Sequence, residues 1–198
     1  MNNFKNYLLI GLIGSTLVLS SCSDDDAPGE EDVLEVITDV TLNFSDGVNT
    51  VSVSASDPDG AGAQPLAVQG PINLSASTAY ILTLDIENGL DPNDIEDIGE
   101  EILEEDDEHQ FFYAFTTDAF TSPAGDGNID LASDALNYND MDDGGCAVGL
   151  NTTWTTGTAQ MGGTFRVVLK HQPDIKTCTT GSTDGDTDFD LTFVLNIN

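Results

Sequence analysis

Apolar and polar side chains alternate along residues 79–87, and this pattern restricts the fold more than any other feature of the chain. Tyr80, Leu82, Leu84 and Ile86 occupy every second position. Successive side chains of a β-strand point to opposite faces, so these four residues predict one apolar face of a half-buried strand.

Further short segments rich in β-branched and aromatic residues lie between turn-forming clusters such as Asp57-Pro58-Asp59-Gly60. These segments span 36–44, 50–54, 108–117, 146–156, 162–171 and 187–197. The first two are separated by a few residues only and predict a hairpin. Many short strands at this spacing indicate a mostly β fold, a single β-sandwich-like domain over 33–198 or a related barrel.

Residues 91–105 depart from the alternating pattern. Their isoleucines recur at steps of three and four, the period of a helix (Ile95, Ile98 and Ile102). Asp91 is suited to the N-cap and Pro92 to the first helical position. The acidic residues 104–107 oppose the helix dipole at the far end, where fraying is expected. We predict one short acidic helix here, with an acidic loop as the alternative.

The N-terminus has the layout of a secretory signal. Lys5 precedes an apolar run at 7–19 that is too short to span a bilayer, because a spanning helix needs about 20 apolar residues. The following Leu19-Ser20-Ser21-Cys22 resembles the lipobox of bacterial lipoproteins. We therefore expect residues 1–21 to be a signal peptide and Cys22 to be the lipidated N-terminus that holds the protein on the membrane.

Residues 22–32 predict a flexible acidic tether, since no apolar residue precedes Val33. An acidic stretch beside the lipidated cysteine resembles the signal that sends Bacteroidetes lipoproteins to the cell surface. The resemblance implies a lipid-anchored protein of the outer membrane that faces outward. A solvated spacer facing the periplasm is the alternative.

The charge balance excludes some partners. The whole chain has a formal charge of −32, and loss of Lys5 with the signal peptide lowers it to −33. Only Arg166, Lys170 and Lys176 then face 36 acidic residues. Nucleic acids and anionic lipids are recognised through lysine and arginine, so neither is an expected partner. The acidity fits either saline surroundings or local binding of cations.

Two cysteines are left once Cys22 carries a lipid. Cys146 and Cys178 would lie in an oxidising compartment, and two thiols there predict one disulfide. A site for a soft metal is the alternative, but neither cysteine has a second cysteine or a histidine at ligand spacing.

The two histidines stand at the ends of two expected strands. His109 extends the apolar face of Phe111, and His171 extends the apolar face of Leu169. If the strands run antiparallel, both histidines lie at the same end of the domain, beside the acidic run 104–108. Two imidazoles and a carboxylate such as Glu108 suit zinc or a similar divalent ion. Alternatively, each histidine is a strand-terminal residue with an ordinary hydrogen bond.

The remaining sequence patterns say less about function. The acidic segments 57–60, 140–144 and 184–190 could hold calcium, but none has both the glycine and the glutamate of an EF-type loop. Trp154 could stack on a sugar or belong to the core. No zinc-protease, serine-hydrolase, P-loop or dinucleotide motif occurs. The sequence therefore predicts a protein that is not an enzyme.

Three segments together resemble a group of Bacteroidetes lipoproteins often labelled "type 1 periplasmic binding fold superfamily protein". They are the lipobox with its tether, residues 104–113, and Leu169-Lys170-His171-Gln172-Pro173. The label names an α/β fold, whereas the residues of this chain predict strands. The resemblance implies an accessory lipoprotein near a TonB-dependent transporter of the outer membrane.

Two hypotheses follow. The first is a ligand-binding accessory lipoprotein that takes up a divalent metal such as zinc through His109, His171 and Glu108. The second is a structural or adhesion module whose loops contact a protein or glycan, with no metal site.

Overall fold

The computed structural model describes residues 35–57, 59–60 and 65–198. The expected signal peptide, the lipid attachment at Cys22 and the tether up to residue 32 lie outside these residues. The elements, in chain order, are β1 (Asp39–Ser45), β2 (Thr50–Ser56), β3 (Ala67–Val68), β4 (Ile72–Leu74), β5 (Ala79–Asn88), β6 (Glu96–Asp97), α1 (Ile98–Glu104), β7 (His109–Phe115), β8 (Phe120–Ser122), β9 (Asn151–Thr156), β10 (Gln160–His171) and β11 (Asp186–Ile197).

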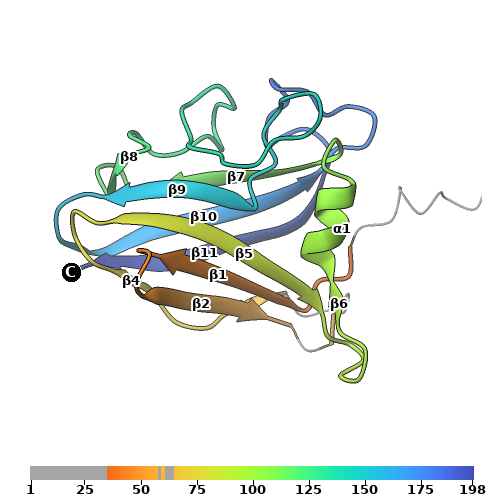
Figure 1. Ribbon diagram of the computed structural model, residues 1–198, viewed down its shortest axis with the longest axis horizontal. Helices are drawn as coiled ribbons and strands as arrows, with labels where there is room; N and C mark the ends of the chain where they lie inside the picture. The colour runs from red at the N-terminus through yellow and green to blue at the C-terminus, as the bar shows by residue number, and fades with distance from the viewer. Residues whose placement is uncertain (1–34, 58, 61–64) are drawn as a thin grey trace, which may run out of the picture.

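These strands form two facing sheets, so the predicted β-sandwich-like domain is confirmed (Figure 1). One sheet has the order β3-β2-β1-β5-β9-β8, with β6 paired to β5, and the other has the order β4-β11-β10-β7. All the strand pairs are antiparallel except β4 with β11. The hairpin of β1 and β2 is present as predicted.

The core lies between the sheets and is built from the alternating residues. Leu42 of β1 is paired with Leu84 of β5, and both side chains are buried. Aromatic rings then join the two sheets: the ring of Trp154 on β9 lies 5.1 Å from that of Phe165 on β10. Trp154 is fully buried and donates a hydrogen bond to Thr152 Oγ1, so it is a core residue and cannot stack on a sugar at the surface.

The helix exists but begins later than predicted. It starts at Ile98, and its N-cap is Asp97, whose side chain accepts from the Glu100 N–H. Asp91 instead accepts the Asn93 N–H in a turn, and Ile95 is exposed. The expected start was wrong because residues 96–97 pair with the end of β5, which holds them in an extended conformation that a helix cannot adopt.

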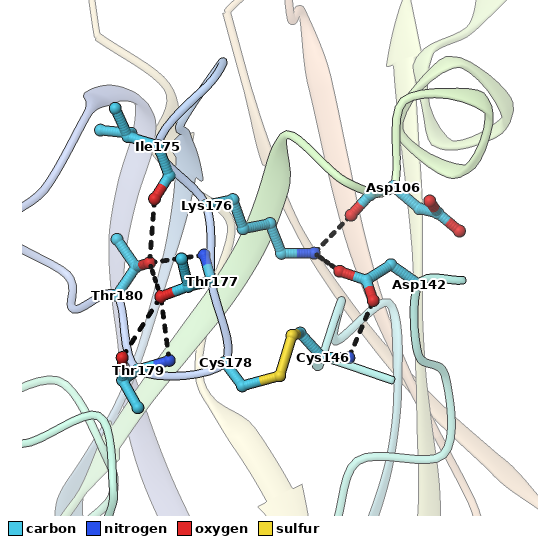
Figure 2. The surroundings of a disulfide bond; sticks show 9 residues. All are labelled: Asp106, Asp142, Cys146, Ile175, Lys176, Thr177, Cys178, Thr179 and Thr180. Atoms are coloured by element: carbon cyan, nitrogen blue, oxygen red, sulfur yellow. Dashed lines mark hydrogen bonds and ion pairs between the residues drawn. A yellow bond between two sulfur atoms is a disulfide. The ribbon is translucent and has the colours of Figure 1, made fainter. Parts of the chain in front are cut away.

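Cys146 and Cys178 form the predicted disulfide, which joins two long loops, the one before β9 and the one after β10 (Figure 2). Among the described residues, no helix is long and apolar enough to cross a membrane.

Candidate functional site

His109 and His171 meet at one end of the sandwich. β7 and β10 are antiparallel neighbours, and their register places His171 directly opposite His109. Both side chains point to the core face of the sheet, in line with Phe111 and Leu169. His109 has no exposed surface and His171 is 4% exposed, so the histidines are buried and do not stand at an open rim.

The two imidazole rings are stacked. Their centroids are 4.6 Å apart and their planes differ by 5°. The lone pair of an imidazole nitrogen lies in the ring plane, so two parallel rings do not aim at one point between them. Two nitrogens bound to one zinc ion are at most about 4.2 Å apart, given zinc–nitrogen bonds of about 2.0–2.1 Å. A shared ion therefore requires at least one ring to rotate about its Cβ–Cγ bond.

The protonation of His109 is set by its neighbours. Its Nδ1 lies 3.2 Å from the backbone oxygen of Glu105, the residue after α1. An oxygen of this kind only accepts, so Nδ1 carries the proton and Nε2 has the lone pair. Burial, chiefly, lowers the pKa of His109 to about 4, with further lowering by His171 and Lys176 and an opposing effect of the Glu105 carbonyl. His109 is therefore neutral at pH 7, which is the form that binds a metal.

Nε2 of His109 has no hydrogen-bond partner among the described residues, although it is buried. A buried polar atom of this kind calls for an explanation, because burying it without a partner costs about 1–3 kcal/mol. A bound ion would satisfy it.

Glu108 lies beside the second histidine. Its Oε2 is 3.4 Å from Nε2 of His171, which makes an ion pair when the histidine is protonated. This contact is compatible with a metal site, in which Glu108 would be a further ligand, and with a site without metal, in which Glu108 is only the charge partner of His171.

Glu105 completes the group. The potential ligand atoms of Glu105, His109 and His171 all lie within 4.8 Å of one another, and no other such group of three is found in the described part of the chain. The sequence placed the acidic run 104–108 here but named Glu108 rather than Glu105. The turn between α1 and β7, in which the Glu108 N–H donates to the Glu105 carbonyl at 2.9 Å, brings Glu105 to His109, and no local period of the sequence signals this.

Several contacts hold the loops around this end of the sandwich. Gln172, just after His171, donates its backbone N–H to the carbonyl of Glu108 at 2.7 Å. Farther along the same loop, Lys176 donates to the carbonyl of Asp106 and, at 2.9 Å, to Asp142 Oδ2 (Figure 2). Asp142 also accepts the backbone N–H of Cys146, so this ion pair and the disulfide lock the same two loops together.

Two further carboxyl groups are perturbed. Desolvation, chiefly, and the nearby charge of Glu35 together raise the pKa of Asp188 to about 7 against the opposing effect of Lys170. Desolvation raises the pKa of Glu35 to about 7, with added repulsion from Glu101 and Glu105. Glu35 therefore lies close enough to Asp188 and to the acidic residues of α1 for their charges to interact.

The acidic segments considered for calcium do not form a comparable group within the described residues. Asp140 accepts the backbone N–H groups of Gly149 and Asn151, and Asp184 accepts that of Gly181. Their oxygens therefore stabilise loops.

The chain matches no protein-family model, no curated protein and no solved structure.

Proposed function

We propose that this protein is a lipid-anchored accessory protein of the outer membrane that binds a divalent transition metal such as zinc, and that it is not an enzyme. Glu105, His109 and His171 would hold the ion, with Glu108 or water in the fourth position. The single observation that carries the proposal is the buried, neutral His109, whose Nε2 lacks a hydrogen-bond partner among the described residues and whose ring lies against that of His171.

The chemistry of the group supports zinc over calcium. Calcium takes six to eight oxygen ligands, whereas zinc accepts four ligands and prefers imidazole nitrogen with carboxylate oxygen. The hydrogen bond from Nδ1 of His109 to a backbone oxygen is the usual support for a metal-bound histidine, because it orients the ring and fixes the tautomer.

The location and partner belong to the same proposal. The lipid on Cys22 would hold the domain at the outer membrane, facing the cell surface or alternatively the periplasm. The strongly acidic surface would concentrate cations near the site, and a TonB-dependent transporter is the partner that the family resemblance suggests.

A structural or adhesion module is the second candidate, and one observation favours it. The contact of 3.4 Å between His171 and Glu108 is an ion pair when the ring is protonated, and it needs no metal. The two histidines would then be packing residues, and the loops would provide the contacts to a protein or glycan.

Calorimetric titration with zinc in buffered salt solution separates the two candidates. The polypeptide from Ser23 onward contains every described residue and is the material of choice. We expect saturable binding at one site, at least about ten-fold weaker after Glu105→Gln, and lost in the variant with both His109→Ala and His171→Ala. Glu104→Gln, an exposed neighbour on α1, is the matched control and should bind as the parent does.

Weak binding of many ions that none of these variants changes would reject the metal site. Because both histidines are buried, near-ultraviolet circular dichroism should accompany each titration. Glu105 is only half-buried, so its variant tests the site even if the histidine variant folds poorly. The lipid anchor is tested separately: Cys22→Ser should release the protein from the membrane fraction.

A further inference from the structure

A hollow of about 420 Å³ lies between β5, α1 and the start of β9, and neither histidine lines it. It arises because the edge of β5 is paired in two separate parts. β9 pairs with β5 as far as Thr83, and β6 pairs with it again from Glu87. Between these parts no strand pairs with this edge of β5 in the described chain, and the Leu84 N–H there donates to the carbonyl of Leu150 at 3.1 Å.

The floor of this hollow is apolar. Leu84 and Leu150 are nearly buried beneath it, and Leu103 of α1 stands half-exposed at its side. A leucine that remains 51% exposed at the wall of a recess loses unfavourable contact with water when an apolar group fills the recess.

The rim is acidic. Five carboxylates line the hollow (Asp85, Glu87, Asp97, Glu100 and Asp140), and none of the described lining residues is basic. Asp140 is held in place by backbone N–H groups at 3.0 and 3.1 Å, so at least one of the charges is fixed in position. An apolar floor with a rim of one sign complements a ligand that has an apolar body and a positive group.

We propose that the hollow is a binding site for small organic cations, in which an ammonium group meets the acidic rim and an apolar body covers the leucines. The volume lies within the range of sites for small molecules, about 300–1,000 Å³. The recess is bounded by α1 on one side and β9 on the other, which suits a compact ligand better than an extended peptide. This site does not depend on the proposed metal site.

Phenylbutylamine is a suitable probe, because phenylbutanol and phenylbutyrate keep its apolar body while making the polar end neutral or negative. Titration of the polypeptide from Ser23 by calorimetry should give one saturable site for the amine. We expect the amine to bind about ten-fold more tightly than the alcohol at low salt, less so at high salt, and the acid not to bind.

Variants locate the site. Glu87→Gln with Glu100→Gln should weaken the amine about ten-fold and leave the alcohol unchanged, because both carboxylates are exposed rim charges. Leu103→Gln should weaken amine and alcohol alike by several-fold. Asp118→Asn with Asp126→Asn removes two exposed charges far from α1, beyond the other end of β9, and serves as the charge-matched control with less than about two-fold effect.

Several results would overturn the proposal: equal affinity for amine and alcohol, equal loss in the control variant, or binding of a lysine-rich peptide without binding of the amine. Binding of the amine that is the same with zinc and with EDTA is expected, so failure of the metal site leaves this test intact.

Discussion

Asp188 is the residue whose replacement gives the sharpest test of the electrostatics at this end of the sandwich. It is the extra residue of a bulge in β11: Phe189 pairs with Leu169 and Thr187 pairs with Lys170, which leaves Asp188 without an opposite residue. A bulge redirects the side chain. Both carboxylate oxygens of Asp188 are buried and have no hydrogen-bond partner among the described residues.

This burial makes stability depend on pH. The pKa of Asp188 is raised from 3.8 to about 7 in the folded protein, so between these values the folded chain holds a proton that the unfolded chain has lost. Stability therefore falls as the pH rises through this window and stays low above it. A shift of this size corresponds to about 4 kcal/mol. Partial exposure of the residue and local relaxation reduce the effect, and we expect about 2 kcal/mol.

Asp188→Asn removes the charge and keeps the shape. At pH 8 it should raise the free energy of unfolding by about 2 kcal/mol, or the melting temperature by roughly 4–8 °C, whereas at pH 4.5 it should change stability by less than about 1 kcal/mol. Urea unfolding in EDTA, followed by circular dichroism at both pH values, measures this. Asp174→Asn, an exposed aspartate in the loop after β10 that is not among the charges acting on Asp188, is the control and should have little effect. An equal gain at both pH values, or none at pH 8, would refute the reasoning.

Three further changes test how the loops and the sheet are held. Replacing Cys146 and Cys178 by alanine should lower the free energy of unfolding by roughly 3–4 kcal/mol in the chain-entropy account, given a separation of 32 residues, and calorimetric melting checks it. Lys176→Met leaves the buried Asp142 without its cation and should cost about 3–5 kcal/mol in urea unfolding, partly recovered by adding Asp142→Asn. Gly127→Ala would place a Cβ 2.0 Å from the backbone oxygen of Tyr113, at a φ of +105°. We expect this change to lower the free energy of unfolding by at least about 2 kcal/mol or to prevent folding. Gly125→Ala is the control: its Cβ meets no atom within 4 Å, so it should cost less on the same melting assay.

Local patterns in the sequence determined most of the strands. Alternation along residues 79–87 predicted the buried face of β5 because the side-chain period of a strand is a property of the backbone alone. The same argument placed His109 and His171 at the ends of apolar rows, and the presence of two cysteines besides Cys22 was enough to predict the disulfide.

The tertiary structure decided which residues surround His109 and His171 at the ends of their strands. Pairing with β5 holds residues 96–97 extended and moves the start of α1 to Ile98, although the isoleucine spacing predicted an earlier start. The end of α1 brings the Glu105 carbonyl to His109, and the β11 bulge sets Asp188 near Glu35. These contacts join residues from separate elements. Their distances depend on how the sheets and the helix pack, which no local period of the sequence records.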